Sequence, residues 1–303
     1  MTRRAFLSRY AIFIALGVEC LVLALATTTF FTVDNLTNVL RQNAFPAIIA
    51  AGMTFVILTA GIDLSVGSVV GVAGVLCADA LVHGWGVAAG VCIGLAVGLA
   101  AGTVNGLIVT RVRVPPFVVT LAMMLVLRGA AYKYTNANTI SGLPASFAWL
   151  SQRGAMAGLM AVVFAVAWVL LARTPFGRHV YATGGNREAA WLSGVRVNRV
   201  LMAVYMICGL GAGLAGVLVA SRLNAGYPRA GELYELDAVA AVVVGGTSLF
   251  GGRGSIWGTL AGAFFIGILN NGLNLYNVSP YDQMIVKGAV LLAAASLDRW
   301  RST

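Results

Sequence analysis

The sequence predicts an all-α polytopic membrane protein, and three observations lead to this class. Charged residues make up 10% of the chain, whereas an average soluble domain has roughly 25%. Hydrophobic residues make up 59%, and the mean hydropathy is +0.89. No polar segment is long enough to fold as a soluble domain, so we expect one transmembrane domain over residues 1–303.

Apolar runs recur along almost the whole length and predict about ten membrane-spanning helices, each crossing a hydrocarbon core of about 30 Å. The runs cover residues 10–30, 44–60, 66–82, 85–110, 117–135, 154–172, 200–221, 236–250, 255–275 and 281–297. Three of them, 44–60, 236–250 and 281–297, are short and interrupted. The number of complete spans therefore depends on how these three fold.

The net charge of +10 predicts the orientation of the chain in the membrane and not a nucleic-acid partner. If the N-terminus is cytoplasmic and the spans alternate, 13 of the 20 basic residues fall on the cytoplasmic side and 5 fall outside. Such an excess is the positive-inside bias of membrane proteins. We therefore expect both termini in the cytoplasm, and the loops 136–152 and 222–234 outside.

Glycines spaced four residues apart predict close packing between helices. They are Gly90, Gly94, Gly98, Gly102 and Gly106 in the fourth run, Gly209 and Gly213 in the seventh, and Gly254, Gly258 and Gly262 in the ninth. This spacing places the glycines on one helix face, where a neighbouring backbone can approach closely. A surface on which helices slide past one another is the alternative use.

Two segments interrupt the apolar pattern, and we expect them to be buried in protein or to line a wet cavity. The first is GIDLSVGS at 61–68, with Asp63 and Ser65, and the second is GGTSLFGGRG at 245–254, with Thr247 and Ser248. Asp63 is expected either to N-cap the third helix or to take part in a polar path or in coupling. The glycines of the second segment lack the G-x-x-x-x-G-K-[ST] order of a phosphate-binding loop.

Polar residues within the apolar runs mark where water or a solute could pass. The candidates are Asn105, Arg128, Asn270, Asn271, Asn274 and Lys287. A buried charge is costly unless it is paired or wet, so Arg128 and Lys287 should face the interior, with Asp237 or Asp282 as partner. Lys287 could instead extend to the interface without any function. The neutral amides suit a polar, uncharged solute better than a cation.

The segment YATGGNREAAWLSG, residues 181–194, is polar in a chain that is otherwise apolar. Asn186 is a plausible helix N-cap, Glu188 lies in the first turn, and Gly194 can end the helix in the left-handed conformation. A helix of about two turns is too short to be stable alone in water, so it needs a surface to dock into. An ordinary loop with a helical turn is the alternative.

Several chemical signatures are absent from the sequence. There is no Walker motif, no H-E-x-x-H and no Ser/His/Asp arrangement, and only two histidines are present. Catalysis on this chain and a bound metal are therefore not expected. A relay of membrane carboxylates is also missing, so a carrier of this kind would need a source of free energy on another subunit.

Glu188, Ala189 and Ala190, followed by three residues and Gly194, resemble the EAA-x3-G coupling motif of ABC-importer permeases. In that family this short helix sits in a groove of the ATPase subunit. The downstream I-x-L-P of the broader motif is missing here. The resemblance implies a coupling loop at 173–199, with a coupling helix formed by Gly185, Asn186, Arg187, Glu188, Ala189, Ala190, Ser193 and Gly194.

The rest of the chain is similar to the ribose-type monosaccharide permeases of that class. The segments that carry the similarity are 52–68, 119–129, 176–195, 234–263 and 268–287, within an overall resemblance over 30–297. GIDLSVGS and GGTSLFGG are the most specific of these matches. They favour a monosaccharide as the transported solute.

The resemblance implies a type II ABC-importer permease fold of about ten helices, with inverted-topology halves. It also implies a second permease copy (a homodimer or a heterodimer with a paralogue), ABC ATPase subunits and a soluble sugar-binding protein. ATP and Mg would lie on the ATPase, so this chain would hold no cofactor. The translocation path would lie at the dimer interface, in the inner membrane of a bacterial cell.

The expected outer loop carries charges of both signs, at Arg222, Arg229, Glu232 and Glu235. These residues are candidates for docking the binding protein, because charged rims set the register of a complex. A solvated loop is the alternative.

Other functions remain open at this level. One is a permease of the same fold for branched-chain amino acids or an autoinducer sugar derivative. Another is an ion- or proton-coupled secondary transporter, which should show paired membrane acids. A membrane-embedded enzyme lacks a catalytic constellation.

Overall fold

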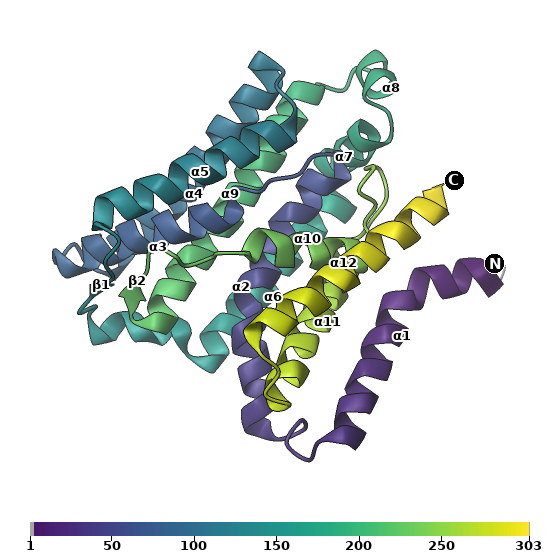
Figure 1. The fold of residues 1–303 in the computed structure, drawn as a ribbon. Coiled ribbons are helices and arrows are strands. Elements are labelled where there is room, and N and C mark those ends of the chain that lie inside the picture. Colours follow the sequence, from purple (N-terminus) through teal and green to yellow (C-terminus); the bar gives the residue numbers. More distant parts are fainter. Residues whose placement is uncertain (1–2, 303) are drawn as a thin grey trace.

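The computed structural model describes residues 3–302, with the side chains of residues 3–10, 153, 297 and 299–302 excepted. Its long helices are α1 (Arg3–Ala26), α2 (Val33–Leu58), α3 (Val66–Val82), α4 (Val87–Leu107), α5 (Pro116–Thr135), α6 (Arg153–Arg173), α9 (Val197–Leu223), α11 (Ile256–Leu275) and α12 (Pro280–Ser302). The shorter helices are α7 (Pro175–Gly185), α8 (Arg187–Leu192) and α10 (Tyr234–Val244). Figure 1 shows how they form one bundle.

Every predicted apolar run falls on a helix, which confirms the all-α class. Six helices of the described chain are long and apolar enough to cross a membrane: α2, α4 with the π-helical turn η1 (Ile108–Val112), α5, α6, α9 and α11. The apolar parts of α1 and α3 are shorter, and α10 has only 11 residues. The confirmed class is therefore a helical membrane protein with several spans, and the number ten stays a prediction.

Two predicted runs differ in length from their helices. Residues 44–60 were expected to be short, but α2 begins 11 residues earlier, because the Thr32 side chain accepts a hydrogen bond from the Asn35 amide and caps the helix. The predicted run 236–250 extends beyond the C-terminal end of its helix, α10. α10 ends at Val244 because Gly245 is followed by Gly246 at φ +88°, a conformation that favours glycine.

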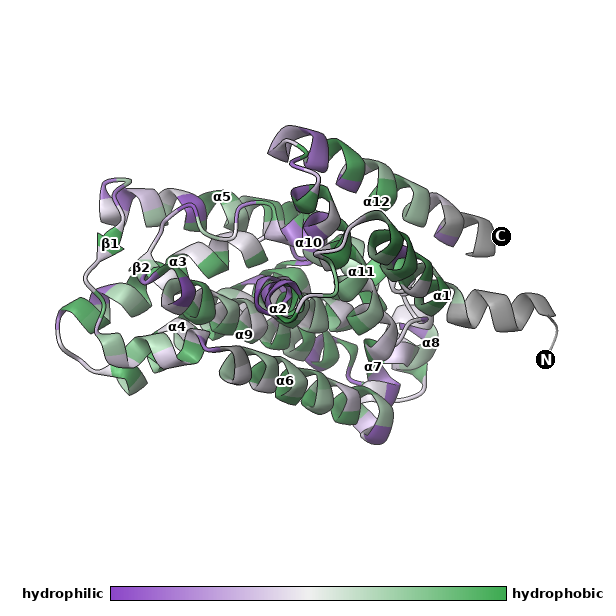
Figure 2. Ribbon diagram, turned by 90° about the horizontal axis from the view of Figure 1, so that it is seen from below, coloured by the Kyte–Doolittle hydropathy of each residue, from purple (hydrophilic) through white to green (hydrophobic). Residues whose placement is uncertain are grey.

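The helix α2 forms the centre of the bundle, and Figure 2 shows α6, α9, α10 and α11 around it. Its residues from Asn43 to Leu58 are buried, apart from Pro46. A helix that is apolar on all sides is expected to be surrounded by protein. By contrast, α1 packs mainly on α11, where Phe30, Val39 and Ile268 form a small separate apolar cluster.

The helices α4 and α9 pack closely against each other, and their glycines make this possible. A Cβ atom at Gly98 would lie 2.9 Å from the Cα of Gly213, and one at Gly209 would lie 3.0 Å from the Cα of Gly102. The predicted glycine faces therefore pack against each other. In α11, Gly258 and Gly262 lie against α10 in the same way, but Gly254 precedes the helix and contacts Thr247 instead.

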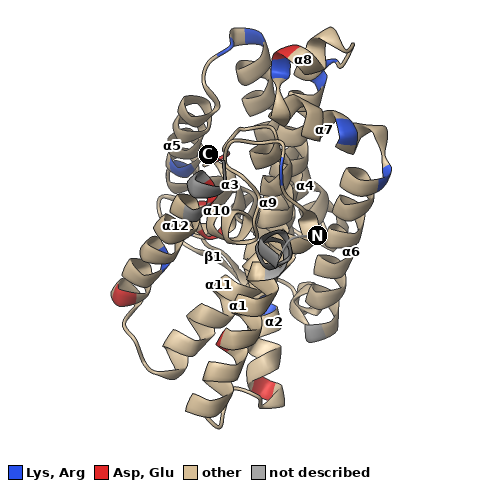
Figure 3. Ribbon diagram, turned by 90° about the vertical axis from the view of Figure 1, so that its right-hand side faces the viewer, with Lys and Arg blue, Asp and Glu red and all other residues tan. Residues whose placement is uncertain are grey.

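One end of the bundle carries α7 and α8, and the other carries the connections 27–32 and 276–279 (Figure 1). Figure 3 shows Lys and Arg gathered around the α7 and α8 end. At the opposite end, Ile140 pairs with Gly226 and Ser141 with Ala225 in a short antiparallel ladder of β1 (Ile140–Ser141) and β2 (Ala225–Gly226). This ladder and the 3-10 helix η2 (Ala145–Ser151) order the two loops that were expected outside.

Candidate functional site

The helix α8 has the structure that its sequence predicts. The Asn186 side chain accepts a hydrogen bond from the Ala189 amide at 2.9 Å, and the helix runs over Arg187–Leu192. Gly194 has φ +84°, and its amide donates to the carbonyl of Trp191 at 2.9 Å. The side chains of Trp191 and Leu192 are 66% and 72% exposed. An exposed apolar pair on a fixed helix is a surface suited to a protein partner.

Residues 175–185 were expected to be part of a loop, but they form the helix α7. Thr174 is its N-cap and accepts a hydrogen bond from the Gly177 amide, while Pro175 takes the first helical position. Threonine followed by proline is a known start signal, so the sequence contained the information needed to find this helix. The helices α7 and α8 follow each other directly, joined at Asn186, at the basic end of the bundle.

The 245–254 loop meets the C-terminal end of α2, just before the 61–68 segment, beneath α7. The Gly252 amide donates to the carbonyl of Leu58 at 2.9 Å, so the end of α2 and the 245–254 loop are joined. A Cβ atom at Gly184 would overlap that same carbonyl, so α7 packs directly on the junction. The Tyr181 hydroxyl donates to the Gly254 carbonyl at 3.0 Å, and Arg187 donates to the Thr59 carbonyl at 3.3 Å.

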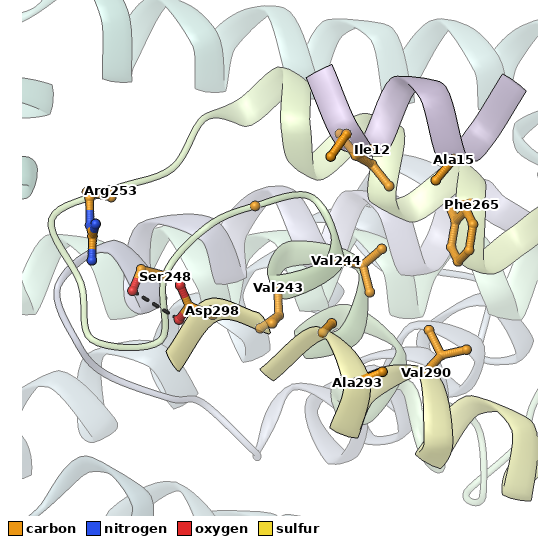
Figure 4. A pocket seen from close by; sticks show the side chains of 13 residues that line it. Ile12, Ala15, Val243, Val244, Ser248, Arg253, Phe265, Val290, Ala293 and Asp298 are labelled. Carbon is orange, nitrogen blue, oxygen red and sulfur yellow. Dashed lines mark hydrogen bonds between the residues drawn. The ribbon is translucent and has the colours of Figure 1, made fainter. Parts of the chain in front are cut away.

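The 245–254 loop is also held from α12. The Ser248 hydroxyl and the Leu249 amide donate to the carboxylate of Asp298 at 3.0 and 3.1 Å. Figure 4 shows this contact at one end of a cavity of about 350 Å³. The labelled side chains from α1, α10 and α11, and the remaining ones from α12, are apolar, and Arg253 of the loop is the other polar one. Sequence reasoning missed Asp298, because an acid near the end of the last helix carries no signal of its own.

Asp63, Ser65 and Asn105 form a buried polar cluster near the same junction. Asp63 Oδ1 accepts hydrogen bonds from the Ser65 amide at 3.0 Å, the Ser65 hydroxyl at 2.6 Å and the Asn105 amide group at 3.4 Å. All three residues are at most 1% exposed. The expectation that Asp63 N-caps α3 is wrong in detail: Ser65 is the N-cap residue, and Asp63 fixes it while joining α3 to α4.

The other predicted path residues lie in different places. In the 245–254 loop, Thr247 and Ser248 are buried. Arg128 donates to the carbonyls of Pro228 and Ala230 at 2.8 and 2.9 Å, and so holds the loop that follows β2. Lys287 pairs with Asp237 at 3.0 Å, which identifies its partner.

The three asparagines of α11 also differ from one another. Asn271 exchanges hydrogen bonds with Asn35 of α2 at 2.8 and 3.0 Å, and Asn274 accepts one from Gln283 of α12 at 2.8 Å. These two residues join helices. Asn270 lines a cavity between α2, α9, α10 and α11.

The four charged residues expected to meet a binding protein divide into two pairs. Arg229 and Glu232 are exposed and lie 3.7 Å apart on the 224–233 segment. Arg222 turns inward, with its guanidinium 5.7 Å from the centre of the Phe45 ring. Glu235 is half-buried near Gly67 of α3.

The apolar bundle, the buried polar cluster and the helices α7 and α8 at one end define a multi-pass membrane protein. Residues 35–295 match the family described as branched-chain amino acid transport system, permease component, and the chain belongs to this family.

Individual relatives match over nearly the full length. The Bacillus subtilis (strain 168) ribose import permease protein RbsC is 48% identical, with 96% of this chain and 92% of the relative covered. The RbsC protein of Escherichia coli (strain K12) is 46% identical, with 97% and 95% covered. The D-allose transport system permease protein AlsC of the same organism is 35% identical, with 97% and 92% covered. No solved structure matches the chain. The resemblance to the ribose-type permeases is thereby confirmed.

Proposed function

We propose that the chain is the membrane-spanning subunit of an ATP-driven ABC importer for a monosaccharide, either a ribose-like pentose or a hexose. The observation that carries the proposal is the 48% identity to a ribose import permease over 96% of the chain. The family description also names branched-chain amino acids, so a permease for such a solute is the second candidate. Ion-coupled transport is disfavoured, because the acids Asp63 and Asp237 are bound by Ser65 and by Lys287 and do not form the pair of acids that such coupling would use.

The coupling element would be α8, received in a groove of an ABC ATPase subunit. Its exposed Trp191 and Leu192 supply apolar contact area, and Arg187 and α7 attach it to the junction of Leu58 and Gly252. A movement of the ATPase would thus act first on the two irregular segments and on the Asp63 cluster. ATP and Mg would be bound by the ATPase, and this chain would hold no cofactor.

The assembly would contain two permease copies, with the path between them, and a soluble sugar-binding protein on the outer face. We place the α8 end in the cytoplasm of a bacterial cell, with both chain termini there, because the basic side chains gather at that end (Figure 3). The type II fold with ten spans and inverted halves belongs to this proposal. Arg229 and Glu232 are the exposed candidates for contact with the binding protein.

The test is uptake into proteoliposomes that contain the chain, its ATPase and its binding protein. ATP-dependent accumulation of labelled D-ribose or D-allose is expected, and an excess of L-leucine should not compete. Accumulation of L-leucine without sugar transport would support the second candidate. Exchanging the charges of Arg229 and Glu232 together should weaken stimulation of the ATPase by the loaded binding protein at low salt.

A further inference from the structure

A polar cavity lies in the half of the bundle that is remote from α8. It has a volume of about 260 Å³ and lies between α2, α9, α10 and α11. Its polar lining comprises Gln42, Asn43, Arg222, Tyr234, Asp237 and Asn270. Since most of the bundle interior is apolar, this grouping needs a specific cause.

Three of these side chains have buried polar atoms without a hydrogen-bond partner among the described residues. They are Nδ2 of Asn43, Nη1 of Arg222 and Oδ1 of Asn270. Asn43 is only 4% exposed, so its amide group is removed from bulk water. Buried donors and acceptors are normally satisfied by protein, ordered water or a ligand. This set supplies donors from two helices and an acceptor from a third, on residues that line the same cavity.

The packing around the cavity preserves these groups. Gly267 of α11 lies against the Asn43 side chain, and a Cβ atom there would overlap the amide. Arg222 is placed over the Phe45 ring, which supports the guanidinium while leaving Nη1 without a partner. Asp237 is engaged by Lys287 at 3.0 and 3.2 Å to its two carboxylate oxygens.

We infer that this cavity, within a single protomer, is a binding subsite for a neutral polyhydroxylated solute of monosaccharide size. A hydroxyl group donates one hydrogen bond and accepts others, so a sugar needs donors and acceptors on the same walls. The cavity provides both, together with the aromatic ring of Tyr234. The inference rests on the proposed sugar transport and adds a place where the solute pauses inside one subunit.

An amino acid fits the cavity less well. Arg222 could receive its carboxylate, but its ammonium group would need an acid, and the carboxylate of Asp237 is already bound to Lys287. Amide groups at Gln42, Asn43 and Asn270 match hydroxyls without requiring charge.

Cysteine protection in the reconstituted importer tests the inference. Two variants, Asn270→Cys and Gln42→Cys, are treated separately with a small membrane-impermeant thiol reagent in the absence of binding protein. The reaction is run without D-ribose and at D-ribose concentrations that rise in 10-fold steps. Gln42 is exposed, so its variant should fold even if the other does not. Saturating D-ribose is expected to slow labelling at both positions at least fivefold. Tyr281→Cys, at an 80% exposed position outside the cavity, is the control and should label at the same rate with and without sugar.

Each outcome has a defined meaning. If neither D-ribose nor D-allose changed the labelling rate at either cavity position, the subsite would be overturned, even if the importer still accumulates sugar. Protection by L-leucine but not by sugar would overturn it as well. Loss of all sugar transport by the unmodified importer would instead reject the proposed function. The unmodified chain measures the background from Cys20, Cys77, Cys92 and Cys208.

A transport measurement gives an independent readout. Asn43→Leu keeps the size of the side chain but removes its hydrogen bonds, whereas Asn43→Gln keeps them. Sugar transported per ATP hydrolysed should fall at least threefold in Asn43→Leu and recover partly in Asn43→Gln. An equal fall of ATPase and transport in both variants would indicate a purely structural role and count against the subsite.

Discussion

At the scale of single residues, Asp63 shows how one buried acid can organise a junction. Its Oδ1 atom receives three hydrogen bonds, from Ser65 and Asn105, in a place that is closed to solvent. Removing the acceptor would leave the Ser65 amide and hydroxyl without this partner, whereas the Asn105 amide group would keep its hydrogen bond to the Ser65 hydroxyl oxygen at 2.9 Å. A buried polar group without a partner costs about 1–3 kcal/mol.

We therefore predict that Asp63→Ala lowers the free energy of unfolding by about 1–3 kcal/mol. Asp63→Asn keeps an oxygen for the Ser65 amide and should be milder. The measurement is the apparent midpoint of thermal unfolding of the purified chain in detergent. If Asp63→Ala were as stable as the unmodified chain, the cluster would not contribute to stability.

A glycine is needed at position 194 because of its backbone conformation and not because a side chain would clash. Its φ is +84°, yet a Cβ atom there would meet nothing within 4 Å. A β-branched residue at this φ costs about 1–2 kcal/mol or more, whereas asparagine tolerates it better. Gly194→Val should reduce capture of the ATPase and uptake roughly tenfold, since 1.4 kcal/mol corresponds to a factor of ten. Gly194→Asn is the matched control and should retain most of both, so equal losses in the two variants would contradict the argument.

At the scale of secondary-structure elements, the α4–α9 contact depends on the absence of side chains. A Cβ atom at Gly102 would overlap the carbonyl of Tyr205 and approach the Cα of Met206 to 3.0 Å. We expect Gly102→Ala to cost about 1–3 kcal/mol of stability, the usual effect of overpacking. Gly158→Ala on α6, where nothing lies within 4 Å, should be neutral or slightly stabilising. The measurement is the midpoint of thermal unfolding of the two variants. Equal midpoints would show that the close α4–α9 contact does not limit the size of residue 102.

The surface of α8 gives a second prediction at this scale. Ala190 is 5% exposed and faces the interior of this chain. A bulky residue at this position would therefore disturb the packing of α8 on its own protein before it could affect contact with a partner. Trp191 and Leu192 are the exposed side chains. Replacing both by alanine should lower ATPase capture in pull-downs at least tenfold, while Glu188→Ala should cost less than about 1 kcal/mol. Leu125→Ala, at a 65% exposed position on α5, is the control. Normal capture by the double variant would mean that α8 is not the contact.

The sequence was sufficient where the cause is local. Asn186 and Gly194 predicted both ends of α8, and the four-residue spacing of glycines predicted the packed faces of α4 and α9. The meeting of Leu58, Gly184 and Gly252 could not be predicted, because it depends on contacts between segments more than 60 residues apart. The length of α2 was not predicted either. Polar residues are frequent before Asn43, so this segment lay outside the apolar run, although Thr32 caps a helix that includes it.

At the scale of the whole molecule, the two polar regions lie at different levels of the central helix α2. The Asp63 cluster and the helices α7 and α8 lie near the C-terminal end of α2, and the cavity at Asn43 and Asn270 lies against its middle. The buried helix α2 reaches both, and its neighbour α9 is in turn held against α4 by glycine contacts. Such an arrangement can transmit a shift at α8 as a movement of packed helices, because closely packed interiors deform little.

The distribution of charge over the whole molecule predicts its orientation. Basic residues surround α7 and α8, so this end should be cytoplasmic and the loop at 136–152 should be outside (Figure 3). Asn138→Cys, at an exposed position in that loop, should react in intact cells with a membrane-impermeant maleimide. Ala189→Cys, exposed on α8, should react only after the membrane is permeabilised. Because an even number of spans returns the chain to the side on which it began, a tag at the C-terminus should then be protected in intact cells as well. Labelling of Ala189→Cys from outside, with Asn138→Cys protected, would reverse the orientation and remove α8 from the reach of any cytoplasmic ATPase.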